Sequence, residues 1–410
     1  MEKLQELPWS GRPTARAVLK ALLDADIEAR FVGGCVRDAW LGMATSHTDL
    51  DMATPATPDA VTRALTRADI KAVPTGIEFG TITAVTSNDK IEITTLREDI
   101  ETDGRHAVVK FGTDWEKDAA RRDFTINALY ADADGTLYDY FGGLDDIRVR
   151  RVRFIGAAGE RIKEDYLRVL RFFRFSARFA EAVDSEGAAA CSAAASGLSR
   201  LARERVWMEL GKILALNDPL RAVQPMLDAG VLQALLPGMP FNPARLGRMA
   251  DYEHDNHVVP SAVLRLAALG DVAPQVLRDR LMLSNRQVDY LGLAQESLRA
   301  SDTRALKATW YRNAEKIMPP TVLHNIVLLL LADDDTRGTH KWPTDLFALA
   351  AAWDVPVFPL SGSDVLALGI PAGERVGQLL AQVEASWVEN DFRPSRDDCL
   401  MQLKAAAQES

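Results

Sequence analysis

Two aspartates spaced by one residue, Asp49 and Asp51, are the most informative feature of this 410-residue sequence. In an extended strand, residues i and i+2 point to the same face, so both carboxylates can face a divalent cation. Mg²⁺ prefers such oxygen ligands together with phosphate oxygens. Upstream, Gly33 and Gly34 let the backbone approach a triphosphate, and Arg37 supplies a guanidinium for phosphate oxygens. The combination predicts metal-dependent nucleotidyl transfer, whereas a lone DxD is most often a surface turn.

A second segment, RRDFTINAL at 121–129, mixes charged, aromatic and amide residues too quickly for one amphipathic period. Arg121 and Arg122 can hold phosphates. Asp123 or Asn127 can hydrogen-bond ribose hydroxyls, by which RNA-type sugars differ from deoxy sugars. We interpret the segment as a nucleotide-binding element, and a strand with polar ends is the alternative that the residues leave open.

The segment ERIKEDYLRVLRFFRFSARF at 160–179 has no Gly or Pro and shows helical spacing of apolar residues, which predicts one continuous helix. Asp165, Arg168 and Arg171 then lie along one flank. Aspartate only accepts hydrogen bonds, and arginine only donates them. Cytosine and adenine present an amino donor beside a ring-nitrogen acceptor, and guanine and uracil reverse this pattern. An Asp/Arg pair can therefore favour C and A, and an ordinary i,i+3 salt bridge is the alternative.

In this order the segments resemble the superfamily of class II tRNA nucleotidyltransferases and bacterial poly(A) polymerases, and most closely its CCA-adding enzymes. The resemblance spans about residues 31–210 and includes FVGGCVRDAWLG, HTDLDMATPATPDAV, IEITTLRED, RRDFTINALYAD, FGGLDDI and RERVWMEL. It implies an α/β nucleotidyltransferase head with a small mixed β-sheet, followed by an all-α neck, body and tail. It also implies template-independent addition of CCA to the 3′ end of tRNA from CTP and ATP.

The same resemblance implies roles for individual residues. Asp49 and Asp51 would bind two Mg²⁺ ions, with Glu92 as a supporting catalytic carboxylate. Two-metal sites of this kind activate the attacking hydroxyl and balance charge on the leaving pyrophosphate. The positions that match the family's nucleotide-binding set are Gly33, Gly34, Arg37, Arg121, Arg122, Asp123, Asn127, Asp165, Arg168 and Arg171.

Two further elements follow from the resemblance. Asp103, Arg105 and His106 match a flexible loop that the site needs when it changes from adding C to adding A. CC-only enzymes of the family have a shortened loop, so its full length here argues against CC-only addition. Arg205 and Glu209 match a pair that braces the base-reading helix, which is a structural role.

Alternatives to CCA addition differ in the features that they require. An A-adding tRNA nucleotidyltransferase would share every motif, and the sequence does not separate it from a CCA-adding enzyme. Poly(A) polymerases tend to be strongly basic toward the C-terminus, whereas the last thirty or so residues here are mildly acidic. A non-catalytic RNA-binding protein on the same scaffold would lose a DxD aspartate, and a small-molecule nucleotidyltransferase would not need the Asp165/Arg168 pair.

Sequence patterns divide the chain into a catalytic head at 1–145, a neck at 146–216, a body at 217–300 and a tRNA-binding tail at 301–410. Strand-like runs alternate with helical patterns in the head, and the remainder is helical in pattern. The net charge of −10 is unusual for an RNA partner. However, residues 146–178 hold ten basic and four acidic residues, which favours phosphate contact beside the proposed site.

The remaining features concern location and metals. The polar N-terminus and the shortness of the longest apolar run, IVLLLLA, predict a cytoplasmic protein without a membrane partner. A monomer is favoured. Three widely spaced cysteines argue against a disulfide framework or a zinc site. His254 and Asp255 resemble metal ligands, but we expect them in a polar loop without a metal.

Overall fold

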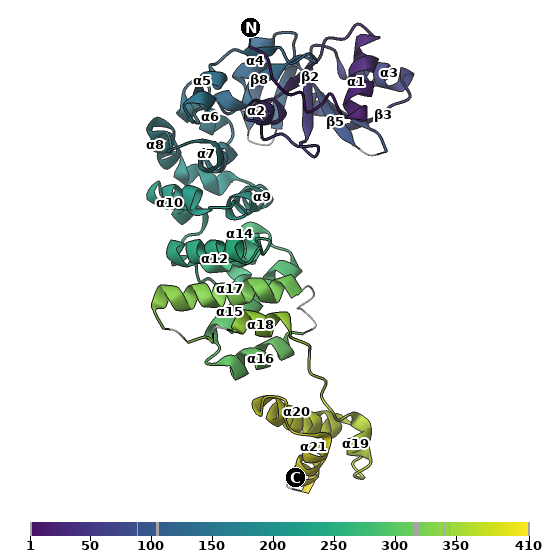
Figure 1. Ribbon diagram of the computed structural model, residues 1–410, viewed down its shortest axis with the longest axis vertical. Coiled ribbons are helices and arrows are strands. Elements are labelled where there is room, and N and C mark those ends of the chain that lie inside the picture. The colour runs from purple at the N-terminus through teal and green to yellow at the C-terminus, as the bar shows by residue number, and fades with distance from the viewer. Residues whose placement is uncertain are drawn as a thin grey trace. The chain divides into compact units, whose positions relative to one another are not determined.

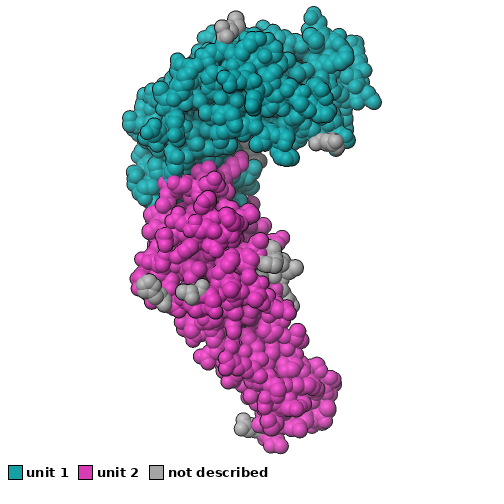
Figure 2. Space-filling model, in the orientation of Figure 1, with its two compact units in different colours: residues 1–210, 221–237 teal, residues 211–220, 238–410 magenta. Residues whose placement is uncertain are grey.

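The computed structural model describes residues 2–87, 89–103, 106–314, 320–339, 341–343 and 345–408. The chain forms two compact units (Figure 2). Unit 1 comprises residues 1–210 and 221–237, and unit 2 comprises residues 211–220 and 238–410. The division into head, neck, body and tail stays a prediction, because these units follow other boundaries and residues 221–237 of the expected body belong to unit 1.

A mixed seven-stranded sheet with the order β3-β4-β5-β2-β1-β8-β9 lies in unit 1 (Figure 1). Strands β2 and β5 are parallel, and the other neighbouring pairs are antiparallel. This head confirms the predicted fold class. The strands are β1 Arg30–Val32, β2 Leu50–Thr54, β3 Lys71–Gly76, β4 Thr81–Val85, β5 Lys90–Thr95, β8 Leu129–Ala131 and β9 Leu137–Asp139, and a separate ribbon pairs β6 Arg97–Asp103 with β7 His106–Phe111.

Helices around the sheet begin where the sequence provides start signals. Helices α1 and α3 both start with proline, and Thr57 accepts a hydrogen bond from the amide of Ala60 at the start of α3. These two helices pack against each other and against β5. The helices through α11 are α1 Pro13–Leu23, α2 Gly34–Trp40, α3 Pro58–Arg67, α4 Trp115–Ala120, α5 Gly143–Arg148, α6 Ala158–Glu164, α7 Leu167–Phe179, α8 Ser185–Ala193, α9 Arg203–Leu214, α10 Leu220–Asp228 and α11 Val231–Leu235, with 3-10 turns η1 Ile77–Phe79, η2 Thr125–Asn127 and η3 Ala195–Arg200.

The expectation of one continuous helix over 160–179 is wrong. Helix α6 ends at Glu164, and α7 begins at Leu167. Between them Asp165 has extended dihedral angles, φ −153° and ψ 106°, and its carboxylate accepts a hydrogen bond from the amide of Leu167. Short polar side chains that bind nearby amides favour helix ends over helix interiors, so Asp165 separates two helices that share one apolar pattern.

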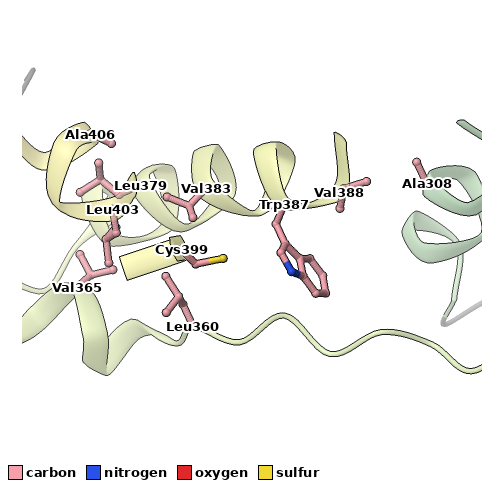
Figure 3. Packing of buried hydrophobic residues seen from close by; sticks show 10 residues of the cluster. All are labelled: Ala308, Leu360, Val365, Leu379, Val383, Trp387, Val388, Cys399, Leu403 and Ala406. Atoms are coloured by element: carbon pink, nitrogen blue, oxygen red, sulfur yellow. The ribbon is translucent and has the colours of Figure 1, made fainter. Parts of the chain in front are cut away.

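Unit 2 is helical over its described residues. A cluster of buried side chains joins α20 and α21, with Leu379, Val383 and Trp387 packed near Cys399 and Leu403 (Figure 3). No helix within the described ranges is long and apolar enough to cross a membrane. The helices are α12 Pro243–Asp255, α13 Ala262–Leu269, α14 Pro274–Leu281, α15 Asn285–Arg299, α16 Thr303–Arg312, α17 Pro320–Arg337, α18 Leu346–Ala351, α19 Gly362–Leu366, α20 Glu374–Glu389 and α21 Arg396–Gln408.

The position of His254 and Asp255 also differs from the expectation of a polar loop. Both residues lie in the last turn of α12, which begins after Asn242 caps the amide of Arg245. The described part of the chain contains no group of three or more His, Cys, Asp or Glu side chains arranged to hold a metal ion. A helical C-terminus that carries polar residues produces the same sequence pattern as a loop, which accounts for the error.

A buried ion pair joins α12 to α13 in unit 2. Glu253 accepts a hydrogen bond from Arg265 at 2.6 Å, and both side chains are only 1% exposed. Arg265 also donates to the carbonyl oxygens of Leu214 and Leu216. Removing one partner of such a pair leaves an uncompensated buried charge, at a cost of about 3–5 kcal/mol.

We therefore expect Glu253→Ala to lower the free energy of unfolding by about 3–5 kcal/mol in chemical denaturation followed by circular dichroism. Arg248→Ala on the same helix is the control, because its pair with Asp335 is largely exposed and is worth at most about 1 kcal/mol. Equal losses in the two variants would contradict the importance of the buried pair.

Candidate active site

Three carboxylates lie at the centre of the sheet. Asp49 immediately precedes β2, and Asp51 is the second residue of that strand. Because β2 and β5 are parallel, Asp51 pairs in register with Glu92. Paired residues point to the same face, and the alternating residues Leu50 and Ile91 are buried on the opposite face. The sheet therefore gathers the three carboxylates on one exposed face.

The carboxylates do not form a complete metal-binding group by themselves in the described structure. Mg²⁺ is commonly held by one or two carboxylates plus substrate phosphates and water. Asp49 and Asp51, two residues apart at an exposed strand, fit this type of site. The ligand set thus depends on phosphate oxygens as well as on the protein.

Electrostatic repulsion within this cluster changes the ionisation of Asp51. Its pKa is raised to about 6, first because neighbouring protein displaces water from the carboxylate, although part of the side chain is exposed. The negative charges of Glu92 and Asp49 raise the pKa further, and the positive charge of Arg122 opposes the rise. A site in which carboxylates repel one another is favourable for binding cations.

Gly33 forms the turn between β1 and α2. Its φ of +75° is strained for residues with a side chain, and its amide donates to the carbonyl oxygen of Leu129 at 2.9 Å. A Cβ atom at this position would lie 3.4 Å from Nη1 of Arg122 and 3.5 Å from the carbonyl oxygen of Asn127. These distances are ordinary van der Waals contacts, so glycine is favoured here by its positive φ rather than by lack of space.

Arg37 lies inside unit 1 and is engaged with protein groups. Its guanidinium donates to Asp38 at 2.7 and 2.9 Å and to the side-chain oxygen of Asn127, and it stacks on the ring of Phe179 at 4.1 Å. Burial lowers the pKa of Arg37, and the charge of Asp38 opposes this effect. The contact of Arg37 with a triphosphate, expected from the sequence, stays a prediction.

Asp123 connects this region to α7. Its carboxylate accepts hydrogen bonds from the amide of Phe124, from Asn127 at 3.1 Å and from Nε of Arg171 at 2.7 Å. It also forms an ion pair with Nη2 of Arg171 at 2.6 Å. Burial would raise the pKa of Asp123, but Arg171 and Asn127 hold it below its usual value. Because three hydrogen bonds and an ion pair engage the carboxylate, Asp123 orients Asn127 and Arg171, and the ribose contact stays a prediction.

A residue that the sequence analysis missed, Asp118 on α4, holds the two adjacent arginines. Its carboxylate, 1% exposed, accepts hydrogen bonds from Arg121 at 2.8 Å, from Arg122 at 3.2 Å and from the Tyr130 hydroxyl at 2.7 Å. Burial opposes ionisation, yet these partners lower the pKa of Asp118 to about 2. The i,i+3 and i,i+4 spacing to the arginines was the available signal, but it equally fits an exposed helix pair.

Asp165 and Arg168 bind different partners in the described structure. Asp165 pairs with Arg205 of α9 at 2.7 Å. Arg168 donates to Glu164 and to the carbonyl oxygens of Arg161 and Arg121. The i,i+3 salt bridge considered from sequence is therefore replaced by these contacts, and Arg168 contacts the segment that carries Arg121.

Helix α9 contacts both the break between α6 and α7 and helix α7 itself. Arg205 binds Asp165 in the break, and Glu209 binds Arg174 in α7. These contacts have the form that a brace requires, although a structural role in base reading stays a prediction.

The predicted flexible loop is described only in part. Arg105 and the side chains of Asp103 and His106 lie outside the described residues. The backbones of Asp103 and His106 pair at the end of the β6–β7 ribbon.

Two family models match parts of this chain. The poly A polymerase head domain matches residues 29–153, and the probable RNA and SrmB-binding site of polymerase A matches residues 182–241. Mitochondrial CCA tRNA nucleotidyltransferase 1 of Mus musculus is 35% identical, with 92% of this chain and 86% of that protein covered. The CCA-adding enzyme of Streptococcus sanguinis is 31% identical, with 94% and 95% covered.

Solved structures give the same result for the fold. The Bacillus stearothermophilus CCA-adding enzyme in complex with CTP has a TM-score of 0.73 at 26% identity, with 99% of both chains covered. The Thermotoga maritima CCA-adding enzyme, complexed with tRNA, has a TM-score of 0.68 at 20% identity, with 99% of both chains covered, and this likeness establishes the fold alone.

The raised pKa of Asp51 predicts a pH-dependent cost in stability. Because the native state holds the proton more tightly than the unfolded chain, ionisation of Asp51 destabilises the metal-free protein as pH rises from about 4 through 6. We expect Asp51→Asn to raise the melting temperature above pH 6 in the presence of a chelator. The gain should vanish at pH 4, where the aspartate of the wild type is already protonated in the folded state.

The control is Asp26→Asn, because Asp26 is exposed and has a positive φ that asparagine also tolerates. This variant should show no gain that appears with rising pH. A constant gain for Asp51→Asn between pH 4 and pH 8 would contradict the electrostatic explanation.

Proposed function

We propose, since this chain belongs to the superfamily of class II tRNA nucleotidyltransferases and bacterial poly(A) polymerases, that it is the enzyme that adds CCA to the 3′ end of tRNA. The substrates are CTP, ATP and a tRNA that lacks these nucleotides. The observation that carries the proposal is the register of β2 and β5, which gathers Asp49, Asp51 and Glu92 on one face. The named CCA-adding relatives match this chain over most of its length.

In the proposed reaction the RNA 3′-hydroxyl loses its proton to water, and its oxygen forms a bond to the α-phosphorus of the nucleotide. The bond from phosphorus to the bridging oxygen breaks, and pyrophosphate leaves with its electron pair. Nucleotidyltransferases generally use divalent metal ions; two Mg²⁺ ions would lower the pKa of the attacking hydroxyl and balance charge on pyrophosphate. Asp49 and Asp51 would hold these ions, and Glu92 would add negative charge beside them.

The reaction needs no covalent enzyme intermediate. Cys35 lies near the glycine turn, but burial raises the pKa of its thiol to about 11. Its sulfur donates to the carbonyl oxygens of Val32 and Asp51. A buried thiol with a raised pKa is a poor nucleophile at neutral pH, so direct transfer to the RNA is the simpler mechanism.

Base selection is proposed to depend on hydrogen-bonding capacity that remains on Asp165 and Arg168. Three of the five N–H donors of Arg168 are used in its described contacts, which leaves Nε–H and one Nη2–H. Each oxygen of Asp165 accepts one described hydrogen bond, from Leu167 or from Arg205, and can accept another. An acceptor and a donor are thus available for the amino group and ring nitrogen of C or A.

The location and the oligomeric state are separate proposals. A cytoplasmic location and a monomeric state stay predictions. The Mus musculus relative is named as mitochondrial. Fractionation of cells that express the chain, and light scattering of the purified protein, are the direct tests.

The function is tested by incubating the protein with Mg²⁺, CTP, ATP and a tRNA that ends at the discriminator base, and sequencing the 3′ ends. We expect CCA on the wild-type products and a loss of both C and A addition, by at least about 10³-fold, in Asp49→Asn and Asp51→Asn. Affinity for tRNA should change little, because phosphate contacts supply most of it. The control is Asp24→Asn, an exposed residue of the Lys20 pair.

Each of the other outcomes would indicate a different function for this protein. Addition of A only to a tRNA that ends in CC indicates an A-adding enzyme, and a run of A indicates a poly(A) polymerase. Binding of tRNA without any addition indicates a non-catalytic RNA-binding protein. Transfer that survives in both aspartate variants would refute the metal assignment.

Base selection is tested with Arg168→Ala and Asp165→Ala. Each variant should lower catalytic efficiency with CTP and ATP and narrow their advantage over UTP and GTP, by roughly 10- to 100-fold for each lost hydrogen bond. The control is Lys163→Ala in α6, whose partner Glu160 is equally exposed. If catalytic efficiency falls by the same factor with all four nucleotides, the pair is structural and base choice depends on other residues.

A further inference from the structure

Arg12 forms a bridge between two loops at the end of the sheet where β2 and β5 begin. It precedes α1 and lies outside residues 29–153, which the head-domain family covers. Its Nε and Nη2 donate to the two carboxylate oxygens of Asp89 at 2.6–2.9 Å, and its Nη1 donates to the carbonyl oxygen of Thr48. One guanidinium therefore holds two segments that are forty residues apart in the sequence.

Both segments lead into the strands that carry the carboxylates. Thr48 immediately precedes Asp49, and Asp89 immediately precedes β5. Because β2 and β5 are parallel, their starting ends lie at the same edge of the sheet. Arg12 thus joins the starting end of the Asp51 strand to the starting end of the Glu92 strand.

The strand ladder fixes these carboxylates unequally. Asp51 and Glu92 are partners inside the ladder, but the first pair of the ladder is Leu50 with Ile91. Asp49 lies one residue before that pair, so the backbone pairing of β2 with β5 does not hold it. The hydrogen bond from Arg12 to Thr48 acts on the residue next to Asp49.

The surroundings of Arg12 make this contact well defined. The Arg12 side chain is 13% exposed, and that of Asp89 is 22% exposed, so water competes little for the pair. A second contact, between the hydroxyls of Thr14 and Thr86 at 2.7 Å, joins α1 to the same turn before β5. Planar guanidinium groups that bind a carboxylate through two oxygens have a restricted orientation.

Arg12 and Asp49 also line one cavity. Its volume is about 790 Å³, and His47, Thr86 and Lys90 contribute to the same wall. The cavity lies within unit 1. Arg12 and Asp49 therefore border the same cavity, at the point where the β2–β5 ladder has not yet begun.

We propose that Arg12 is a positioning residue, which fixes Asp49 relative to Asp51 and Glu92 by holding the Thr48 carbonyl and Asp89 together. The proposal rests on the proposed function to the extent that these carboxylates bind the catalytic metal ions. Mutual repulsion of the carboxylates favours separation of the loop from the sheet, and the contacts of Arg12 oppose it. Arg12 itself does not touch the reacting atoms in this proposal.

The test compares Arg12→Ala and Arg12→Lys with the wild type. A lysine keeps the charge, but its single ammonium group cannot reproduce the fork that binds Asp89 while also reaching Thr48. We expect both variants to lower kcat by about 10-fold or more and to raise the Mg²⁺ concentration for half-maximal rate about 10-fold. KM for CTP and for tRNA should change less than twofold, because the proposal assigns Arg12 no contact with either substrate.

Two measurements do not depend on catalysis. Amide hydrogen exchange at Asp49 and Leu50 should become faster in both variants, whereas exchange at Met52 and Ala53 inside the ladder should stay unchanged. Binding of Mn²⁺ to the tRNA-free protein, followed by electron paramagnetic resonance, should weaken. The control is Lys20→Ala on α1, whose pair with Asp24 is exposed and should affect none of these quantities.

The outcomes separate this proposal from the proposed function. The variants could melt at a lower temperature while kcat, the Mg²⁺ dependence and the amide exchange at Asp49 all stay at wild-type values. That result would mean that Arg12 only stabilises the fold, and it would overturn the proposal. If the wild type adds no nucleotides, the proposed function fails, and the exchange and Mn²⁺ measurements still decide the role of Arg12. If Arg12→Ala does not fold, Arg12→Lys provides the same measurements.

Discussion

The parallel pairing of β2 with β5 is the constraint on which the site depends. It places Asp51 directly beside Glu92, and the pKa of Asp51 is raised to about 6, first by burial of its carboxylate and second by the negative charge of Glu92. The opposite face of the same strands buries Leu50, Met52 and Ile93, and the burial of each such side chain contributes roughly 1.5–3 kcal/mol. Apolar packing on one face therefore offsets the electrostatic cost of the functional face.

The arginines near this acidic face are fixed by buried carboxylates. Asp118 holds Arg121 and Arg122, and Asp123 holds Arg171. In a low-dielectric interior an unpaired charge is costly, so each arginine keeps one orientation before any substrate arrives. Preorganised charges lose little freedom on binding, which is the condition under which they stabilise a charged transition state most effectively.

The sequence predicts those features that depend on local spacing. The period of two in DLD predicts the shared face of Asp49 and Asp51, and the mixed sheet follows from the family resemblance. Features that depend on distant partners could not be predicted. Asp118 is buried where the Tyr130 hydroxyl, twelve residues away in the sequence, binds its carboxylate. The extension of α12 to Asp255, which includes His254, was likewise not predicted. Neither effect leaves a periodic signal in the sequence.

The break at Asp165 shows how such a hidden feature can serve the proposed chemistry. In a continuous helix, Asp165 and Arg168 would lie three residues apart and would neutralise each other. Because the backbone is extended at Asp165, its carboxylate turns to Arg205 of α9, and Arg168 binds Glu164 instead. The acceptor and the donor are thus supported by separate partners. Because Asp165 and Arg168 do not bind each other, both groups can be presented to one base. The interrupted helix therefore suits the proposed reading of C and A better than a continuous helix would.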